Sequence, residues 1–245
     1  MKTVGIVGSG IIGSSWALVF ARAGVPVRIW CREDGQEAET LARMAAMIQA
    51  LRGTGLEGDD ATLKRISVRN SLAETLHDVD YVQESISEDV GQKHDILRAI
   101  ETSAPPDAII GSSTSGIMPS RLSGALSRPE RFLVVHPLTP PHLLPITELC
   151  AAPQTSDAVV SAASDFMRAV GQHPVILRSG IAGFALNRIL GAMVNECFAL
   201  MRDGVVAPED VDALITEGFG LRWGIIGPLA AMDLNAPGGI GEYLK

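Results

Sequence analysis

Three glycines near the start of the chain follow the pattern G-x-G-x-x-G, and they constrain the fold more than any other feature. Gly8, Gly10 and Gly13 stand between the apolar run TVGIVG and the helix-like sequence SSWALVFARAG. The first glycine permits a tight turn, the second lets the backbone approach a pyrophosphate, and the third lets the helix pack against a sheet. The helix N-terminus adds N–H donors and a positive dipole. The motif therefore predicts a dinucleotide site rather than an ordinary turn, formed by Gly8, Gly10, Ile11, Ile12 and Gly13.

Apolar segments and helix-like segments alternate over the first part of the chain. Strands are predicted at residues 3–8, 25–30, 79–85, 107–113, 131–137, 146–151 and 174–178. This alternation predicts an α/β fold with a mostly parallel, doubly wound sheet of the Rossmann type. After residue 181 the apolar positions follow helical spacing instead. We expect a dinucleotide-binding domain over residues 1–181 and a smaller all-α domain over 182–245, which binds substrate and mediates dimerisation.

Composition excludes several classes of protein. The net charge is -8 and aromatic residues make up 4% of the chain, so phosphate neutralisation and base stacking by a nucleic-acid-binding protein are not expected. The three cysteines are isolated, which is typical of a reducing compartment and excludes a zinc site of CxxC type. Because Arg and Lys interrupt the long apolar stretches, no membrane span is expected. We expect a cytoplasmic protein without a bound metal.

The end of the second predicted strand, IWCRED, leaves the choice of dinucleotide open. An acidic residue here accepts hydrogen bonds from the ribose hydroxyls of NAD, but Cys31 occupies that position. Arg32 follows and could pair with the 2′-phosphate of NADP. The alternative is that Arg32 is solvated and that Glu33 or Asp34 reaches the ribose of NAD.

Four polar residues are candidates for the reaction site. Ser115 and His136 each follow a predicted strand, and the strands of a doubly wound sheet bring their carboxyl ends to one edge, over the cofactor. Glu148 lies in the next predicted strand, and Asn187 opens the first helix of the second domain. The other histidines have no partner at a telling spacing and are predicted at the surface or in turns: His77, His94, His142 and His173.

Several stretches together resemble the 3-hydroxyacyl-CoA dehydrogenase family, most of all its branch with λ-crystallin, an L-gulonate 3-dehydrogenase. They cover nearly the whole chain: GIVGSGIIGSSWA, VQESISEDVGQK, SSTSGIMPS, VVHPLTPPHLLPITEL, GFALNRI and EGFGLRWGIIGPL. The resemblance implies hydride transfer between the 3-hydroxyl of an L-3-hydroxy acid or a 3-hydroxyacyl-CoA and NAD, or NADP, to give the 3-keto product. The alternative is a non-catalytic dinucleotide-binding or crystallin-like structural protein.

The resemblance also implies roles for individual residues. His136 is the general base, and Glu148 pairs with it; Ser115 and Asn187 bind the substrate oxygen. Glu88 and Lys93 lie along the nicotinamide-ribose side of the cofactor, the alternative being a solvated helix face. The chemistry is consistent, because an imidazole can take the hydroxyl proton and a carboxylate on its other nitrogen fixes the tautomer.

The chain departs from the family pattern at Thr139, where members usually carry an Asn against the cofactor, and at Cys31. It also stops at GGIGEYLK, which is either a shortened helical domain or a fragment.

CoA-handling members carry a long basic arm, whereas residues 35–66 hold only Arg43, Arg52, Lys64 and Arg65. With Arg222 available to bind a carboxylate, the pattern favours a free hydroxy acid. The apolar stripe from Leu186 to Met201 predicts a homodimer.

Overall fold

The computed structural model describes residues 1–32, 35–235 and 237–243. The chain forms two compact units, Met1–Arg188 and Ile189–Lys245. The sequence placed the division between residues 181 and 182, before the first turn of the long helix α7 (Phe184–Arg202). That turn belongs with the first unit, because the backbone N–H groups of Ala185 and Leu186 bind the side chain of Glu148 in the sheet.

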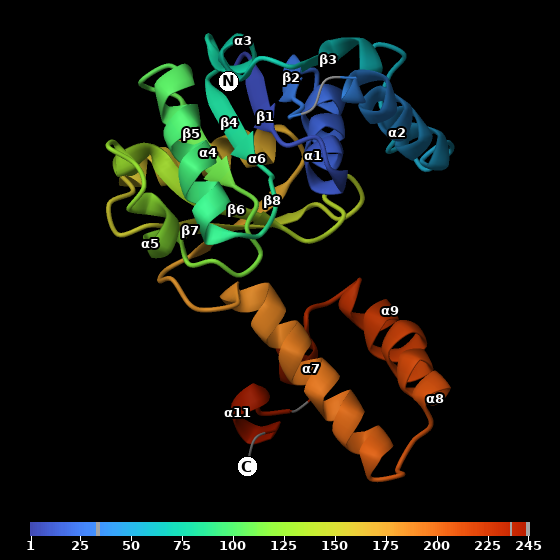
Figure 1. Ribbon diagram of the computed structural model, residues 1–245. Coiled ribbons are helices and arrows are strands. Elements are labelled where there is room, and N and C mark those ends of the chain that lie inside the picture. Colours follow the sequence, from blue (N-terminus) through green and yellow to red (C-terminus); the bar gives the residue numbers. More distant parts are fainter. Residues whose placement is uncertain (33–34, 236, 244–245) are drawn as a thin grey trace. The chain divides into compact units, whose positions relative to one another are not determined.

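One eight-stranded sheet forms the centre of the first unit (Figure 1). Its order is β3-β2-β1-β4-β5-β6-β7-β8, and all neighbours are parallel except the antiparallel pair β6 and β7. The strand order reverses next to β1, which is where doubly wound sheets bind ligands. The strands are β1 (Val4–Val7), β2 (Val27–Trp30), β3 (Ile66–Arg69), β4 (Tyr81–Glu84), β5 (Ile109–Ser112), β6 (Phe132–Pro137), β7 (Ile146–Ala151) and β8 (His173–Leu177).

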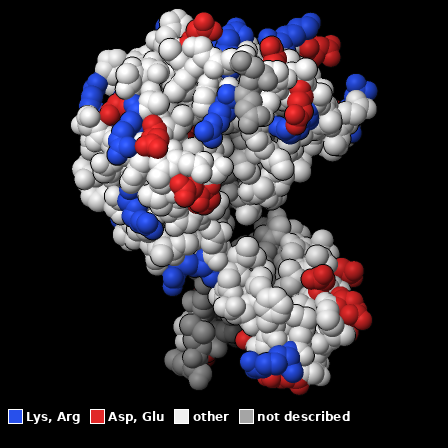
Figure 2. Space-filling model, viewed as in Figure 1, with Lys and Arg blue, Asp and Glu red and all other residues white. Residues whose placement is uncertain are grey.

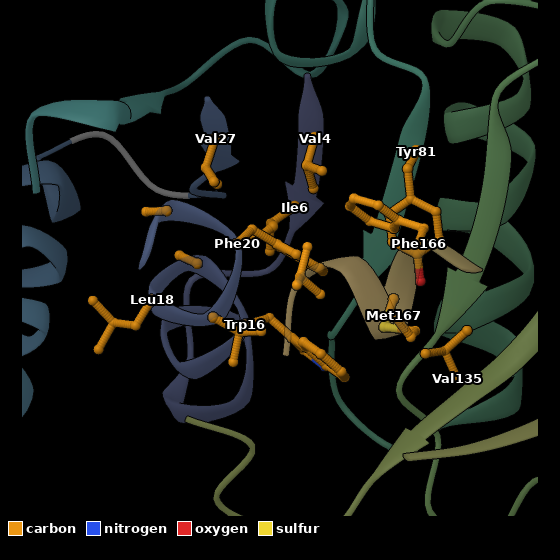
Figure 3. Packing of buried hydrophobic residues seen from close by; sticks show 14 of the residues in the cluster. Val4, Ile6, Trp16, Leu18, Phe20, Val27, Tyr81, Val135, Phe166 and Met167 are labelled. Atoms are coloured by element: carbon orange, nitrogen blue, oxygen red, sulfur yellow. The ribbon is translucent and has the colours of Figure 1, made fainter. Parts of the chain in front are cut away.

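Helices cover both faces of this sheet because successive strand residues point to opposite sides. Ile6 of β1 joins a core with residues of α1 (Ile11–Arg22), α2 (Gln36–Ala50) and α6 (Asp157–Ala169), and Figure 3 shows Trp16, Phe20 and Phe166 in that layer. The neighbouring Val7 joins the opposite core with residues of α3 (Leu72–Leu76), α4 (Val90–Ser103) and α5 (Pro119–Ser123). Two short 3-10 turns, Leu63–Arg65 and Pro129–Arg131, lead into β3 and β6.

The edge strand β3 lies in a segment for which the sequence predicted no strand. It has four residues and pairs in parallel with β2. Ile66 and Val68 face the core, whereas Arg69 is exposed. Two apolar residues in so short a run give little periodicity. The pairing with β2, which is a long-range contact, therefore determines this strand.

The second unit is helical. After α7 it contains α8 (Pro208–Ala213), a π-helical segment (Leu214–Phe219), α9 (Gly220–Trp223), α10 (Pro228–Asn235) and α11 (Ile240–Tyr243). Contrary to the expectation from sequence, α7 is long and apolar enough to cross a membrane, with a mean hydropathy of 1.2. One such helix is weak evidence for a span, because helices of soluble domains pass the same test. On the molecular face shown in Figure 2, the described Lys and Arg side chains are interspersed with Asp and Glu.

Candidate active site

The glycine loop has the geometry that the motif requires. Gly8 has a φ of +113°, and a Cβ there would lie 2.6 Å from the carbonyl oxygen of Ser85. A Cβ on Gly13 would lie 1.9 Å from the Gly8 oxygen, so only glycine fits beneath the turn. At Gly10 no atom lies within 4 Å of the Cβ position, which leaves open space in front of the backbone. These contacts fit a loop that a pyrophosphate approaches closely.

A cleft of ≈ 470 Å³ opens beside this loop. It lies at the carboxyl ends of β1, β2 and β4, and Gly8, Gly10, Trp30, Arg32 and Ile86 are among the residues that line it. Ile11 is exposed and Ile12 packs partly against the core, both in the first turn of α1. An open glycine loop, a helix N-terminus and an adjoining cleft together fit a dinucleotide. Glu33 and Asp34, the predicted ribose-binding alternatives, lie outside the described residues.

His136 and Glu148 meet because β6 and β7 are antiparallel. The two residues are directly opposite each other in the register, so their side chains lie on the same face of the sheet. The imidazole Nδ1 is 2.9 Å from Glu148 Oε2. Both side chains are almost completely buried, at 4% and 2% exposure. The spacing of twelve residues in the sequence is thus a cross-strand pair, and the structure brings the predicted couple together.

Glu148 is held at its other oxygen as well. Oε1 accepts hydrogen bonds from the backbone N–H groups of Ala185 at 2.8 Å and Leu186 at 3.0 Å, in the first turn of α7. These N–H groups have no partner within the helix, and the helix dipole favours a carboxylate at that end. The ring of Phe184, whose φ is +52°, lies 5.2 Å from the imidazole centroid. Hydrogen bonds to both oxygens therefore fix the Glu148 carboxylate, and the contacts with Glu148 and Phe184 fix the His136 imidazole.

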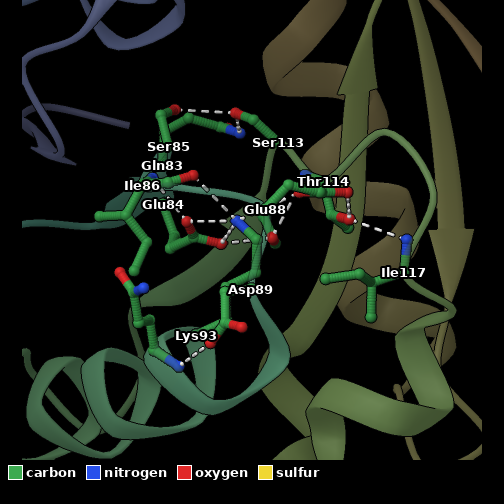
Figure 4. A network of polar contacts seen from close by, with 12 residues as sticks. Gln83, Glu84, Ser85, Ile86, Glu88, Asp89, Lys93, Ser113, Thr114 and Ile117 are labelled. Atoms are coloured by element: carbon green, nitrogen blue, oxygen red, sulfur yellow. Dashed lines mark hydrogen bonds and ion pairs between the residues drawn. The ribbon is translucent and has the colours of Figure 1, made fainter.

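The run of four hydroxyls after β5 divides into three that bind protein groups and one that is open. Ser112 donates to Glu84. Ser113 accepts from Gln83, and Thr114 donates to Glu88 (Figure 4). Ser115 is exposed, and its hydroxyl has no hydrogen bond to any residue in the described part of the chain. This pattern leaves the Ser115 hydroxyl available to an external oxygen.

Glu88 holds the backbone around Ser115. Its Oε1 accepts from the N–H groups of Ser115 at 2.9 Å and Gly116 at 3.0 Å. The Asn187 amide donates to the Ser115 carbonyl oxygen at 2.7 Å, so the predicted substrate residues are adjacent. Glu88 was predicted beside the cofactor ribose; in the structure its bonds position the Ser115 loop.

Lys93 is neither solvated nor open to the cleft. It is 1% exposed, and its ammonium group lies 2.7 and 2.9 Å from the two carboxylate oxygens of Glu84, itself fully buried. The Ile86 carbonyl accepts from the same ammonium group at 3.3 Å, and Glu88 lies 3.7 Å away (Figure 4). No role was predicted for Glu84 from the sequence. The only available signal was a carboxylate at the end of an otherwise apolar strand, with a lysine in the following helix.

Three further predictions have plain outcomes in the structure. His142 lies in a turn, as one form of the prediction had it, but it is buried there, with Nδ1 3.0 Å from the Ser15 hydroxyl. Cys31 is buried, with its sulfur 3.6 Å from the Thr40 hydroxyl, so a thiol and not a carboxylate occupies position 31. Arg222 lies in the second unit, 6.0 Å from the centroid of the Phe219 ring, and its role toward substrate stays a prediction.

Two other observations limit the chemistry that the described residues can perform: the pKa of a buried thiol and the search for metal-ligating clusters. Burial and, to a smaller extent, the Glu148 carboxylate raise the pKa of the Cys150 thiol to about 11, so Cys150 does not supply a thiolate at neutral pH. No cluster of three or more metal-ligating side chains exists among residues 1–32, 35–235 and 237–243. The arrangement combines a buried acid–base pair near the carboxyl end of β6 with a cleft at the carboxyl ends of β1, β2 and β4, which fits a dinucleotide-dependent oxidoreductase.

Comparison with known proteins gives the family. The 3-hydroxyacyl-CoA dehydrogenase NAD-binding domain matches residues 3–180, and the C-terminal domain of the same enzymes matches residues 183–245. The lambda-crystallin homolog of Bos taurus is 38% identical over 239 residues, which are 96% of this chain and 74% of that protein. The L-carnitine dehydrogenase of Pseudomonas aeruginosa is 37% identical over 96% of this chain and 73% of its own length.

A solved structure agrees with these relatives. The structure of 5-formyl-3-hydroxy-2-methylpyridine 4-carboxylic acid 5-dehydrogenase, an NAD+-dependent dismutase, matches with a TM-score of 0.90 and 28% identity. The match covers 100% of this chain and 78% of that one. The chain belongs to the 3-hydroxyacyl-CoA dehydrogenase family. It is an NAD-dependent dehydrogenase of a 3-hydroxy acid or 3-hydroxyacyl-CoA.

Proposed function

We propose that the chain oxidises the 3-hydroxyl of a free L-3-hydroxy acid to the 3-keto acid, with His136 as the general base. The observation that carries this proposal is the buried contact of 2.9 Å between His136 Nδ1 and Glu148 Oε2. A carboxylate on Nδ1 selects the tautomer that carries its proton there. Nε2 is then unprotonated and able to accept a proton from substrate.

The proton moves from the substrate hydroxyl to Nε2 of His136 as the carbonyl forms. In the described part of the chain no residue binds Nε2, so this atom is free for the substrate. The bound nicotinamide supplies the hydride acceptor. Glu148 stabilises the imidazolium that results, and the N–H groups of Ala185 and Leu186 keep the carboxylate in place.

Ser115 orients the reacting oxygen. Its hydroxyl is open, while Glu88 and Asn187 hold its backbone N–H and carbonyl groups. A hydroxyl on so constrained a loop can donate to the oxygen as it becomes a carbonyl, without reorganising first. Asn187 keeps one amide hydrogen and its amide oxygen for the substrate, because the bond to Ser115 uses only the other amide hydrogen.

Two observations support a free acid over a CoA thioester. The segment between residues 35 and 66 holds only four basic residues, Arg43, Arg52, Lys64 and Arg65, and Arg65 is paired with Asp59, so it offers little positive charge for the phosphates of CoA. The chain is also similar to L-carnitine dehydrogenases, named for a free 3-hydroxy acid. We propose that Arg222 receives the substrate carboxylate.

The experiment compares matched substrates with one enzyme preparation. NADH formation is measured with L-carnitine and L-3-hydroxybutyrate as free acids, and with L-3-hydroxybutyryl-CoA. We expect a higher kcat/KM for a free acid, and we expect Arg222→Gln to raise KM for the acid without changing NAD binding. A CoA thioester that is turned over faster than both acids, and equally well by the variant, would reject this substrate class.

We also propose that the chain forms a homodimer through its helical unit. Helix α7 has large apolar side chains that are open to solvent, with Ile189 70% and Phe198 62% exposed. Burial of such a surface in a closed two-fold pair is the commonest solution for soluble chains.

A further inference from the structure

We propose that the rim of the cofactor cleft contains a subsite for the 2′-phosphate of NADP, formed by Arg32 and Arg43. The chain would then accept NADP in addition to NAD. The proposal needs only that the cleft binds a dinucleotide; it does not depend on the substrate class proposed above. It concerns the adenosine end of the cofactor, far from the hydride-accepting ring.

The position that normally selects NAD is filled by a neutral, inward-facing group. Cys31 follows β2 directly, is fully buried and has its sulfur 3.6 Å from the Thr40 hydroxyl. A carboxylate at this place accepts from the ribose hydroxyls and repels a 2′-phosphate. The cysteine does neither, so position 31 does not discriminate against NADP.

Arg32 contributes the first positive charge. It is exposed, and it lines the main cleft together with Gly10 and Trp30. It forms no ion pair or hydrogen bond with another described residue, so no described carboxylate neutralises its guanidinium group. An arginine directly after the second strand is where a doubly wound fold receives the 2′-phosphate.

Arg43 contributes the second charge from the neighbouring helix α2. It lines a smaller hollow of ≈ 260 Å³ that shares Ser9, Gly10 and Gln36 with the main cleft, so the two hollows adjoin at the glycine loop. Its Nη1 donates to the Ser9 carbonyl oxygen at 2.6 Å, which fixes the guanidinium group against the loop. Its Nη2 pairs with Glu39, whose side chain is 71% exposed.

The pair with Glu39 does not close the subsite. An exposed ion pair within one helix is weak and is readily exchanged for a stronger partner. A phosphate dianion accepts two parallel N–H bonds from an arginine, which are stronger than bonds to a neutral group. The smaller hollow is lined by polar residues such as Thr40 and Arg43. It adjoins the main cleft, in which the adenosine ribose of the cofactor would lie.

The test uses fragments that carry no nicotinamide, so dehydrogenase turnover plays no part. The full chain is titrated with 5′-AMP and with 2′,5′-ADP, and binding is measured by calorimetry. The wild type is expected to bind 2′,5′-ADP at least as tightly as 5′-AMP. Arg32→Ala is expected to weaken 2′,5′-ADP binding by about tenfold or more and to leave 5′-AMP binding nearly unchanged. Glu39→Gln is expected to strengthen 2′,5′-ADP binding selectively.

Two further variants separate a direct role from a structural one. Arg43→Ala also frees the Ser9 carbonyl, so a loss that is equal for both nucleotides would mean that Arg43 only braces the loop and would overturn its part in the subsite. Arg52→Ala removes the same charge just after α2, outside both hollows, and is expected to change neither affinity. Weaker binding of 2′,5′-ADP than of 5′-AMP by the wild type, or no selective loss in Arg32→Ala, would overturn the proposal.

Discussion

Single residues of the site do more than one task, and Glu148 is the clearest case. One of its oxygens meets the His136 imidazole, and the other accepts from Ala185 and Leu186 at the start of α7. The proposed acid–base pair and a helix N-terminus therefore share one carboxylate. Burial of the Glu148 charge costs desolvation free energy, and this cost is offset because both carboxylate oxygens have hydrogen-bond partners among the described residues.

Glu148→Gln tests this dual role. An amide keeps one acceptor but offers an N–H where a second acceptor was needed, so it cannot satisfy His136 and α7 together. We expect turnover to fall by about 10-fold to 10²-fold, less than for loss of the base itself, with the fold retained. The measurement is kcat against pH from about 6 to 9, beside the exposed control Glu130→Gln. Full activity across that range would show that the pairing is irrelevant.

His142 gives a prediction for stability rather than for rate. Burial, followed by the nearby charge of Arg22, lowers the pKa of His142 below its usual value. The unfolded chain therefore binds the proton at a higher pH than the folded chain. Above about pH 6.5 His142 is neutral in both states and does not lower the free energy of unfolding. As the pH falls below that value, the unfolded chain takes up the proton more readily, so the free energy of unfolding decreases.

The variant His142→Gln tests whether protonation of His142 lowers stability at acid pH. Between about pH 7.5 and 5.5 the Tm of the wild type should fall more than that of the variant, because the variant lacks the buried titrating group. His173→Gln, at an exposed histidine, should keep the wild-type slope. Equal slopes in all three proteins would remove His142 as a source of acid sensitivity.

At the scale of elements, β4 and α4 are joined by a buried ion pair. Glu84 ends the strand, Lys93 lies in the first half of the helix, and both are at most 1% exposed. From the same segment, Glu88 holds the loop of Ser115. The pair thus links the cofactor side of the sheet to the loop that faces the substrate.

Breaking this pair should be costly. Glu84→Gln leaves the buried Lys93 ammonium group with only the more distant Glu88 carboxylate, 3.7 Å away, and we expect a loss of about 3–5 kcal/mol in the free energy of unfolding. The double variant Glu84→Gln/Lys93→Met should recover much of that loss. Urea unfolding measures both, with Glu39→Gln as a surface control. A single variant as stable as the surface control would mean that the ion pair contributes nothing.

Elements with strong local signals could be predicted from the sequence, and those fixed by distant contacts could not. The glycine loop and the alternation of strands and helices are encoded within short windows, so β1, α1 and the class of fold follow from them. The edge strand β3 depends on its pairing with β2. Burial of Lys93 depends on Glu84 and on the packing of α4, which no spacing pattern reveals.

The candidate site shows the same division. His136 and Glu148 were predicted from strand ends together with the family resemblance, and the antiparallel register brings them into contact. The backbone clamp on Glu148 and the loop bonds of Glu88 were not predicted. Both depend on N–H groups whose direction only the folded chain defines.

For the whole molecule, the helical unit gives the prediction of a homodimer. Light scattering in the micromolar range should give about twice the chain mass of 25.9 kDa. Phe198→Glu places a charge on the exposed apolar side of α7 and should shift the mass toward that of one chain. A wild type that stays at 25.9 kDa throughout the range would refute the dimer.

The central claim for the molecule is that His136 takes the substrate proton as hydride leaves for NAD. The most direct measurement is NADH formation by wild type and His136→Gln with the best L-3-hydroxy substrate, alongside NAD binding by calorimetry. We predict that the variant binds NAD with unchanged affinity and loses about 10²–10⁴-fold in turnover. Near-normal turnover by the variant would contradict the assignment of His136 as the base.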